Sequence, residues 1–295
     1  MIADELLQGA IDLHVHGYPE ISNDVKTRLD DLEIVKAAKE SGMRAIVLKS
    51  HMWPTVGRAY HLQKQFPGFY VFSSITLNIT VGGLNAVSVE SAARQGAKVI
   101  FMPTWSASND FRRGGFSTYM KTYLDSLRNL LPEPGLQLLD EGGHLKHEVH
   151  EILQIARSYK LAIATGHIGI EESVALIEET KRQEVGPLIY NHPDSRSVGA
   201  TRTQMKMMAD KGAFVEICAL GMMPAFQRIH PREVIEIVRD IGAEKCVLSS
   251  DFFFDWAPPV PEMLRMTMGT LLSLGLSSEE IRLMVQTNPA RILRL

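Results

Sequence analysis

Short apolar runs alternate with longer amphipathic stretches along this chain of 295 residues. Eight runs are brief and rich in Val, Ile, Leu and Phe, which is typical of strands buried on both faces: Ala10–Val15, Ala45–Lys49, Tyr70–Thr76, Lys98–Met102, Leu161–Thr165, Pro187–Asn191, Ala213–Cys218 and Cys246–Ser250. Between them, apolar residues recur at helical spacing in Leu29–Ser41, Asn85–Gln95, Lys146–Tyr159, Ile170–Arg182, Thr201–Lys211 and Pro231–Ile241. This alternation predicts an α/β protein with a parallel sheet, and eight strands close a (β/α)8 TIM barrel.

The link between the fourth and fifth strands is much longer than the others. We expect one barrel domain over residues 1–295, with an insertion at approximately residues 106–145. Several prolines and glycines fall in Leu130–Gly143, and a small hairpin is expected around Leu136–Leu145. A doubly wound open sheet is the alternative, but such sheets usually have fewer strands and no Gly-rich dinucleotide fingerprint follows any strand here.

Composition narrows the functional classes. The chain is 45% hydrophobic and 22% charged with a net charge of −3, which excludes general disorder and argues against a strongly basic nucleic-acid surface. The two cysteines, Cys218 and Cys246, cannot form a disulfide framework or a four-cysteine zinc site. The first residues lack the pattern of a signal peptide, and no apolar run is long enough to span a membrane. We therefore expect a cytoplasmic protein.

Polar side chains gather where the predicted strands end, which is where TIM barrels carry their active sites. The first strand ends with His14 and His16, which lie two residues apart and therefore point to the same side. Two imidazoles placed in this way can bind one divalent cation. The alternative for an isolated His-x-His is a pair of packed or surface histidines.

Further residues of the same kind end other strands: Lys49 and His51 on the second, His167 on the fifth, His192 on the sixth and Asp251 on the eighth. A lysine in a barrel mouth is costly unless it is paired, so Lys49 is expected to bind a substrate anion or to be modified, or else to extend to solvent. The recurrence of metal-ligand residues at one rim favours a metal site.

Other polar residues are expected to support the metal ligands or to lie on the surface without a part in the site. Glu216 on the seventh strand is expected to support a ligand rather than to bind metal itself. His144, His147 and His150 share a helical side without a carboxylate of zinc-protease type, and we expect them to be exposed to solvent.

The ordered set of His14, His16, His167, His192 and Asp251 resembles the amidohydrolase superfamily, and the ending Thr287–Leu293 is also similar to that of its members. The resemblance implies one or two divalent metals, with zinc expected and manganese, iron or nickel as alternatives. His14 and His16 would bind the first metal, and Asp251 would complete its shell and accept a proton from the attacking water. His167 and His192 would bind a second metal; in one-metal members, His167 would join the first and His192 would polarise the substrate.

The fourth strand departs from that pattern. Two-metal members usually have a carboxylated lysine or a glutamate there, whereas this chain offers Thr104. Either the site holds one metal or the bridging group comes from elsewhere. Lys49, two residues before His51 at the same rim, is our candidate for the bridge as a carbamate.

These residues predict a hydrolase in which metal-activated water attacks an amide, cyclic amide, lactone or ester of a small molecule. The alternatives are a mononuclear decarboxylase or hydratase of the same superfamily, and a barrel that binds a metabolite without catalysis. Substrate contacts are expected from Lys49 together with His51, Arg112, Arg113 and Trp53, and Trp105 and Trp256 could also shape the pocket. We expect a small-molecule substrate, no nucleic acid and no membrane, and leave a homo-oligomer open.

Overall fold

The computed structural model describes residues 2–123 and 134–295 of the chain. Its eight strands are all parallel and are hydrogen-bonded in the order of the sequence. They confirm the predicted strands, which differ from the observed ones by at most one residue at either end: β1 (Ile11–Val15), β2 (Ala45–Leu48), β3 (Tyr70–Thr76), β4 (Ala97–Phe101), β5 (Ala162–Ala164), β6 (Leu188–Tyr190), β7 (Phe214–Cys218) and β8 (Cys246–Ser249).

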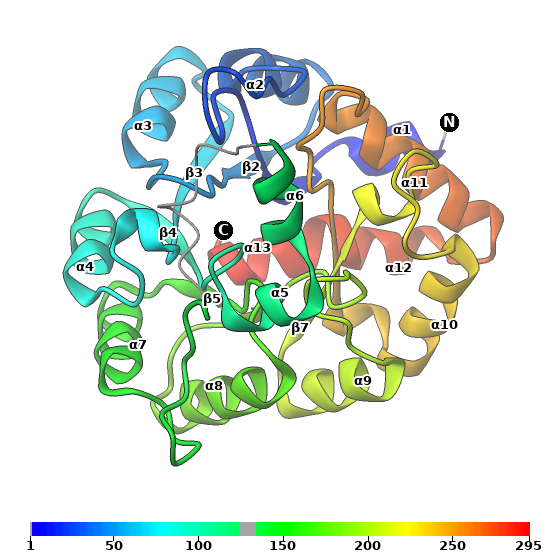
Figure 1. Ribbon diagram of the computed structural model, residues 1–295. Helices are drawn as coiled ribbons and strands as arrows, with labels where there is room; N and C mark the ends of the chain where they lie inside the picture. Colours follow the sequence, from blue (N-terminus) through cyan, green and yellow to red (C-terminus); the bar gives the residue numbers. More distant parts are fainter. Residues whose placement is uncertain (1, 124–133) are drawn as a thin grey trace.

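Helices surround the sheet in the order of the chain (Figure 1). The ring and its flanking helices comprise α1 (Ile2–Leu7), α2 (Asp31–Glu40), α3 (Val56–Gln65), α4 (Ala86–Arg94), α7 (His147–Tyr159), α8 (Ile170–Arg182), α9 (Arg202–Lys211), α10 (Pro231–Ile241), α11 (Val260–Ser273), α12 (Ser278–Arg282) and α13 (Asn288–Leu293). The predicted (β/α)8 barrel is therefore confirmed. Three-residue to five-residue helical turns, η1 (Ile79–Val81), η3 (Ala219–Met222), η4 (Ala243–Lys245) and η5 (Leu283–Thr287), complete the described elements.

A buried carboxylate joins the first strand to the end of the last one. Asp12 accepts hydrogen bonds from the backbone N–H groups of His14 at 3.0 Å and Ser250 at 3.1 Å. The backbone N–H of Asp251 donates to the His14 carbonyl, and that of His16 donates to the Phe252 carbonyl, both at 3.0 Å. These bonds bring the ends of β1 and β8 together and complete the ring of strands.

The barrel interior is packed rather than hollow. Its buried apolar residues form one cluster with the end of α13: Ile11, Leu13, Ala45, Val47, Val99, Phe101, Ala162, Ala164, Ile189, Phe214, Val247, Ile292 and Leu293. Because α13 contributes Ile292 and Leu293, it covers the end of the barrel at which the strands begin. The opposite end is left for polar side chains.

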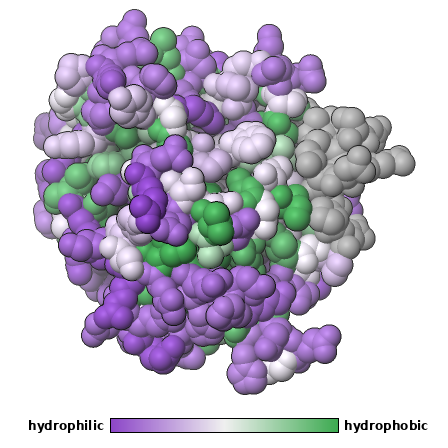
Figure 2. All heavy atoms as spheres, turned by 90° about the vertical axis from the view of Figure 1, so that its left-hand side faces the viewer, coloured by the Kyte–Doolittle hydropathy of each residue, from purple (hydrophilic) through white to green (hydrophobic). Residues whose placement is uncertain are grey.

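The outer surface is mainly polar because each helix turns its apolar side chains toward the sheet. In α7, for example, Val149, Ile152, Leu153 and Ala156 are buried. On the face that carries α3, α4 and α7, hydrophilic side chains predominate and apolar ones show mainly near its centre (Figure 2).

The long link between β4 and β5 begins with two short helices, α5 (Ser108–Arg113) and α6 (Phe116–Tyr123), which lie over the centre of the barrel in Figure 1. Backbone hydrogen bonds join Leu136 to Ser106 and Ser108, and an isolated antiparallel bridge pairs Leu139 with Leu145 within the expected hairpin. Residues 124–133 of the expected insertion lie outside the described residues.

No helix in the described ranges combines the length and the apolar character that crossing a membrane requires.

Asp12 also allows a test of the barrel closure. Burial raises the pKa of its carboxyl from 3.8 to about 7, although the N–H groups of Ser250 and His14 act in the opposite direction. A raised pKa means that the folded state holds a proton which the unfolded chain releases. The contribution of Asp12 to the free energy of unfolding of the metal-free protein should therefore fall as the pH rises from about 4 to about 7, by at most about 4 kcal/mol.

Asp12→Asn should remove this loss, so that the stability difference between the variant and the parent shifts in favour of the variant between pH 5 and pH 7.5. Urea unfolding at both pH values measures it, with the exposed Asp255→Asn as the control. An equal pH dependence in Asp12→Asn and the parent would contradict the buried, protonated carboxyl.

Candidate functional site

A cavity of about 410 Å³ opens at the end of the barrel where the strands finish. Polar side chains from several strand ends reach it: Lys49, His51, His167, His192 and Asp251. The remaining wall comes from the α5–α6 segment and from the loops after β6, β7 and β8. Its volume lies within the range of small-molecule sites.

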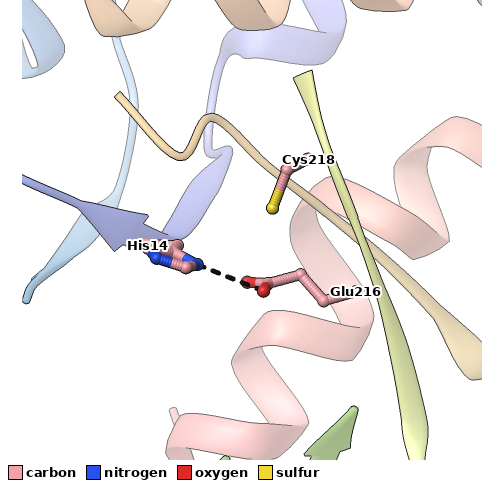
Figure 3. Close-up of side chains that lie close together, drawn as sticks. All are labelled: His14, Glu216 and Cys218. Atoms are coloured by element: carbon pink, nitrogen blue, oxygen red, sulfur yellow. Dashed lines mark hydrogen bonds and ion pairs between the residues drawn. The ribbon is translucent and has the colours of Figure 1, made fainter. Parts of the chain in front are cut away.

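His14 lies at the bottom of this site and is fully buried. Its Nδ1 lies 3.1 Å from the Glu216 Oε2 of β7 (Figure 3). The Asn191 side-chain amide donates to the same oxygen at 2.8 Å. Burial raises the pKa of the Glu216 carboxyl and that of the Cys218 thiol beside it. A neutral thiol is a poor metal ligand, so this group orients His14, the supporting role that the sequence suggested for Glu216.

His16 and His51 share one carboxylate oxygen. Glu20 Oε1 lies 3.1 Å from His16 Nδ1 and 2.7 Å from His51 Nδ1, and it accepts the His51 backbone N–H at 2.5 Å. The two imidazoles stack with their centres 4.4 Å apart. Burial raises the pKa of the Glu20 carboxyl, but the two histidines outweigh it and hold that pKa well below its usual range.

His167 is held in the same way by the insertion. Its Nδ1 lies 2.6 Å from Asp110 Oδ2, on α5, and the Asp110 carboxylate also accepts the backbone N–H of Ser117. The His167 ring lies 5.0 Å from the ring of His192, centre to centre, and His192 lies 5.5 Å from His14. Asp110 thus connects the α5–α6 segment to the polar cluster.

One arrangement therefore recurs at four histidines: a buried carboxylate holds Nδ1, and Nε2 is left for another partner. Metal-binding histidines usually show this pairing, since the carboxylate fixes the tautomer and the orientation of the ring. Burial, the largest cause, lowers the pKa of His14, His51, His167 and His192. Neutral imidazoles with a free lone pair are the form that binds a cation.

The Nε2 atoms of His14 and His16 converge on Asp251. Its Oδ1 lies 3.2 Å from His14 Nε2 and 3.7 Å from His16 Nε2, and the latter atom is buried without a hydrogen-bond partner in the described part of the chain. Ligand atoms of His14, His192 and Asp251 all lie within 4.8 Å of one another. This donor set of imidazoles and a carboxylate fits a divalent transition-metal ion.

Lys49 is the other polar group in this cluster. Its Nζ lies 2.9 Å from His14 Nε2 and 4.8 Å from the centre of the Phe101 ring, and the residue is almost fully buried. Burial lowers the pKa of the Lys49 ammonium, while Asp251 and Glu216 partly offset the effect. The lysine therefore faces the candidate metal ligands rather than solvent.

Two residues of the cluster have unusual backbones. Asp251 has φ 53° and His192 has φ 21°, both on the left-handed side that residues with a Cβ seldom adopt. Such conformations are held only where the surrounding structure demands them, and they concentrate at functional sites. Here they turn the chain sharply at the ends of β8 and β6.

Some residues expected at the substrate site lie elsewhere. Trp53 is 66% exposed, Trp105 is fully buried with its indole N–H on the His51 carbonyl, and Trp256 stacks on Phe254. Arg112 and Arg113 are exposed on α5, and Arg113 donates to the Arg196 carbonyl. None of these five is among the residues that line the cavity in the described ranges.

The histidines near the expected hairpin are arranged as the sequence suggested only in part. The side chains of His144 and His147 are both 84% exposed, whereas His150 is 35% exposed and lies 3.0 Å from Glu179. They form no metal-binding group with one another among the described residues.

At the end of β4, where the sequence departs from the two-metal pattern, uncharged side chains form a network of hydrogen bonds. Thr104 accepts a hydrogen bond from the Asn78 side-chain amide at 2.7 Å and donates its backbone N–H to Asn78 Oδ1 at 2.8 Å. Ser106 donates to the same Asn78 oxygen. No carboxylate takes the bridging place at this strand end in the described chain.

Sequence patterns gave no indication of Glu20, Asp110 or Arg228. Each lies in a loop or an insertion and has a contact to the cluster that is remote in the sequence, although Glu20 also contacts His16 four residues before it. The sequence did indicate Phe253 and Phe254, since they lie two and three residues after Asp251 in a loop at the end of the barrel where the strands finish.

Solved structures of similar fold cover nearly the whole chain. An amidohydrolase from Pseudomonas aeruginosa has a TM-score of 0.67 at 14% identity, with 99% of this chain and 98% of that chain covered. A probable 2-pyrone-4,6-dicarboxylic acid hydrolase from Acinetobacter baumannii has a TM-score of 0.61 at 12% identity, with 98% and 100% covered. A 2,6-dihydroxybenzoate decarboxylase from Rhizobium has 0.57 at 10%, with 97% and 99% covered.

These likenesses confirm the fold implied by the resemblance to the amidohydrolase superfamily. Residues 9–216 match the model of a family described as a family of unknown function (DUF6282). A comparison with curated proteins gave no match.

Glu20 provides a test of the candidate metal ligands that does not depend on any activity. Glu20→Gln should lower the affinity for zinc by about 10-fold to 100-fold, because His16 and His51 lose the charge that holds their Nδ1 atoms. Competition with a chromophoric chelator measures the affinity, and the exposed Glu141→Gln is the control. Equal zinc affinities in Glu20→Gln and the parent protein would show that His16 does not bind the ion.

Proposed function

We propose that this chain, which belongs to the family of unknown function DUF6282, is a metal-dependent hydrolase that cleaves an amide, cyclic amide, lactone or ester of a small molecule. The observation that carries the proposal is the convergence of carboxylate-held imidazoles on Asp251 at the wall of a cavity. A packed structural cluster has no need to leave an imidazole nitrogen such as His16 Nε2 buried and without a partner.

In this proposal, His14, His16 and Asp251 hold a divalent cation, with His192 and His167 beside it as further ligands. Zinc suits this donor set, and manganese, iron and nickel are alternatives. When bound, the cation supplies Lewis acidity, which makes water ionise near neutral pH and polarises a carbonyl group.

Asp251 acts as the general base and acid. Its carboxylate faces the imidazoles with Oδ1 and the cavity side with Oδ2, where the Arg228 guanidinium lies 3.9 Å away. A carboxylate in this place accepts the proton of the attacking water and passes it to the departing nitrogen or oxygen. The sharp backbone turn at Asp251 directs the side chain to this position.

His192 orients the substrate carbonyl when it is not itself a ligand. Burial and the neighbouring His167 and His14 lower its pKa, so the imidazole is neutral. Its Nδ1 has no hydrogen-bond partner in the described residues, and the ring lines the cavity. A neutral imidazole N–H can donate to the carbonyl oxygen on which negative charge develops.

A mononuclear decarboxylase or hydratase is the second candidate. The neutral Asn78–Thr104 network favours it, since nothing at the end of β4 would bridge two ions. One of the structural relatives is a 2,6-dihydroxybenzoate decarboxylase. A third candidate is a barrel that binds a metabolite without catalysis, but it would have no use for the buried donor set.

Metal content and one substitution separate these candidates. Elemental analysis of protein purified without chelator or affinity tag should find one or two divalent ions per chain. Asp251→Asn should lower kcat/KM on a responsive amide, lactone or ester by at least about 100-fold while much of the metal stays bound, because a general base contributes about 10²-fold or more. The exposed Asp255→Asn in the same loop is the control.

The result against the proposal is protein that takes up no ion even after incubation with zinc or manganese. One ion with release of CO2 from a carboxylic acid would favour the decarboxylase. Bound metal with unchanged turnover in Asp251→Asn would remove Asp251 from the chemistry.

We also propose that Lys49 carries the bridging group when two ions bind. The neutral amine, which burial favours, attacks CO2: an N–C bond forms while one C=O π bond of CO2 breaks and leaves its electron pair on oxygen, and the proton released by the nitrogen passes to water. The resulting carbamate would lie beside His14 Nε2, where Nζ now lies 2.9 Å away. The two carbamate oxygens would then supply the bridging group between two ions that is missing from the end of β4.

A carbamate on Lys49 would change the measured mass of the protein. Native mass spectrometry of the metal-loaded protein should show the added mass of one CO2, which acidification removes, and Lys49→Arg should lack it and bind one ion fewer. An unmodified mass together with two bound ions would contradict the proposal.

A further inference from the structure

The cavity has a cationic wall that the metal chemistry does not use. We propose that Arg228 makes this site selective for substrates with a carboxylate close to the reacting carbon and an apolar or aromatic group beyond it. The inference rests on the proposed function for the position of the reacting carbon, but not for the recognition of the acid. The loop after β7, which no part of the proposed mechanism needs, thus becomes the specificity element.

Arg228 is held in place before any ligand binds. Its backbone N–H donates to the Gly221 carbonyl at 3.0 Å, which closes the loop between η3 and α10. Its Nε donates to Asp194 Oδ2 at 2.9 Å, in the loop after β6, and the guanidinium lies 5.3 Å from the centre of the Phe226 ring. The side chain is only 17% exposed. A fixed guanidinium loses little conformational entropy when it binds a ligand.

Arg228 lines the cavity, and part of its guanidinium lacks a hydrogen-bond partner among the described residues. The hydrogen bond from Nε to Asp194 is the one that Arg228 makes with its side chain in the described chain, and Nη2 is buried without a partner. Asp251 Oδ2 is 3.9 Å from Nη2, which is too far for a hydrogen bond. A guanidinium can donate two parallel hydrogen bonds to a planar carboxylate, so the missing partner is an anion of this shape.

The location of Arg228 limits where the anionic group sits. Asp251 faces the guanidinium with one oxygen and His14 with the other, so the anion lies next to the atoms that would react. A substrate carboxylate bound there is separated from the scissile group by only a few bonds. A dianionic phosphate is disfavoured in this place, because it would add charge beside both Asp194 and Asp251.

An aromatic wall adjoins Arg228 at Phe226. Phe116, Tyr119, Phe226, Phe253 and Phe254 line the cavity and contact one another in a continuous cluster, with ring centres 5.1–6.4 Å apart in the contacting pairs. They come from α6 and from the loops after β7 and β8. This wall suits an apolar or aromatic group, and such a group buries more surface than a short polar chain would.

The experiment compares the binding of matched ligands to the chelator-treated, metal-free chain. Without metal, a carboxylate cannot gain affinity by coordinating an ion. Phenylacetate, its neutral amide phenylacetamide, and acetate are titrated by calorimetry. We expect phenylacetate to bind at least about tenfold more tightly than either phenylacetamide or acetate, because it alone satisfies both Arg228 and the aromatic wall.

Variants assign the preference to one residue. Arg228→Gln should abolish the preference for the acid over the amide and leave phenylacetamide binding unchanged. Arg228→Lys keeps the charge next to Asp194 and should retain part of the preference, which covers the case that Arg228→Gln does not fold. The exposed Arg232→Gln, at the start of α10, should behave like the parent.

Equal affinities for phenylacetate and phenylacetamide in the parent would overturn the proposal, as would an acid preference that survives in Arg228→Gln. Neither result bears on the metal chemistry, since no metal is present in the assay. Conversely, a chain that binds no metal but shows the acid preference would refute the hydrolase and keep Arg228 as the anchor of an acid-binding pocket.

Discussion

The site depends on one constraint: an imidazole buried in a barrel must find a partner for each of its nitrogens. Here Glu216, Glu20 and Asp110 hold the Nδ1 atoms, and the Nε2 atoms of His14 and His16 face Asp251. This choice fixes the orientation of the rings, while burial, and not the carboxylates, lowers the pKa of His14, His51 and His167. Some carboxylates orient histidines and another, Asp251, faces the candidate metal position. The site therefore contains more carboxylates than metal binding alone would need.

The barrel makes this arrangement possible because parallel strands bring their ends to one level. Side chains two residues apart on one strand reach the cavity together, as His14 and His16 do. The closure at Asp12 and Ser250 then sets the distance from the first strand to Asp251. The helix α13 covers the other end, so the polar groups have a dry floor of apolar residues beneath them.

Much of the framework followed from the sequence, because strand and helix periodicity are local properties. The convergence of His14, His16, His192 and Asp251 followed as well, since it needs only the strand ends and the barrel rule. Glu20 and Asp110 could not be predicted, because their partners are set by how loops fold back. For the same reason the sequence wrongly suggested that Arg112 and Arg113 contact the substrate. It shows that they follow β4 closely, but not which way the helix α5 turns its side chains. Arg228 occupies the corresponding place instead.

The left-handed backbone at Asp251 and His192 has an evolutionary consequence. Each such residue costs on the order of 1 kcal/mol of stability, which a glycine or, in part, an asparagine would recover. A protein that kept the barrel but lost the chemistry would gain by making those replacements. Glycine at these two positions would therefore mark a pseudoenzyme among sequences of this barrel type, and a retained aspartate and histidine would mark selection for reactivity over stability.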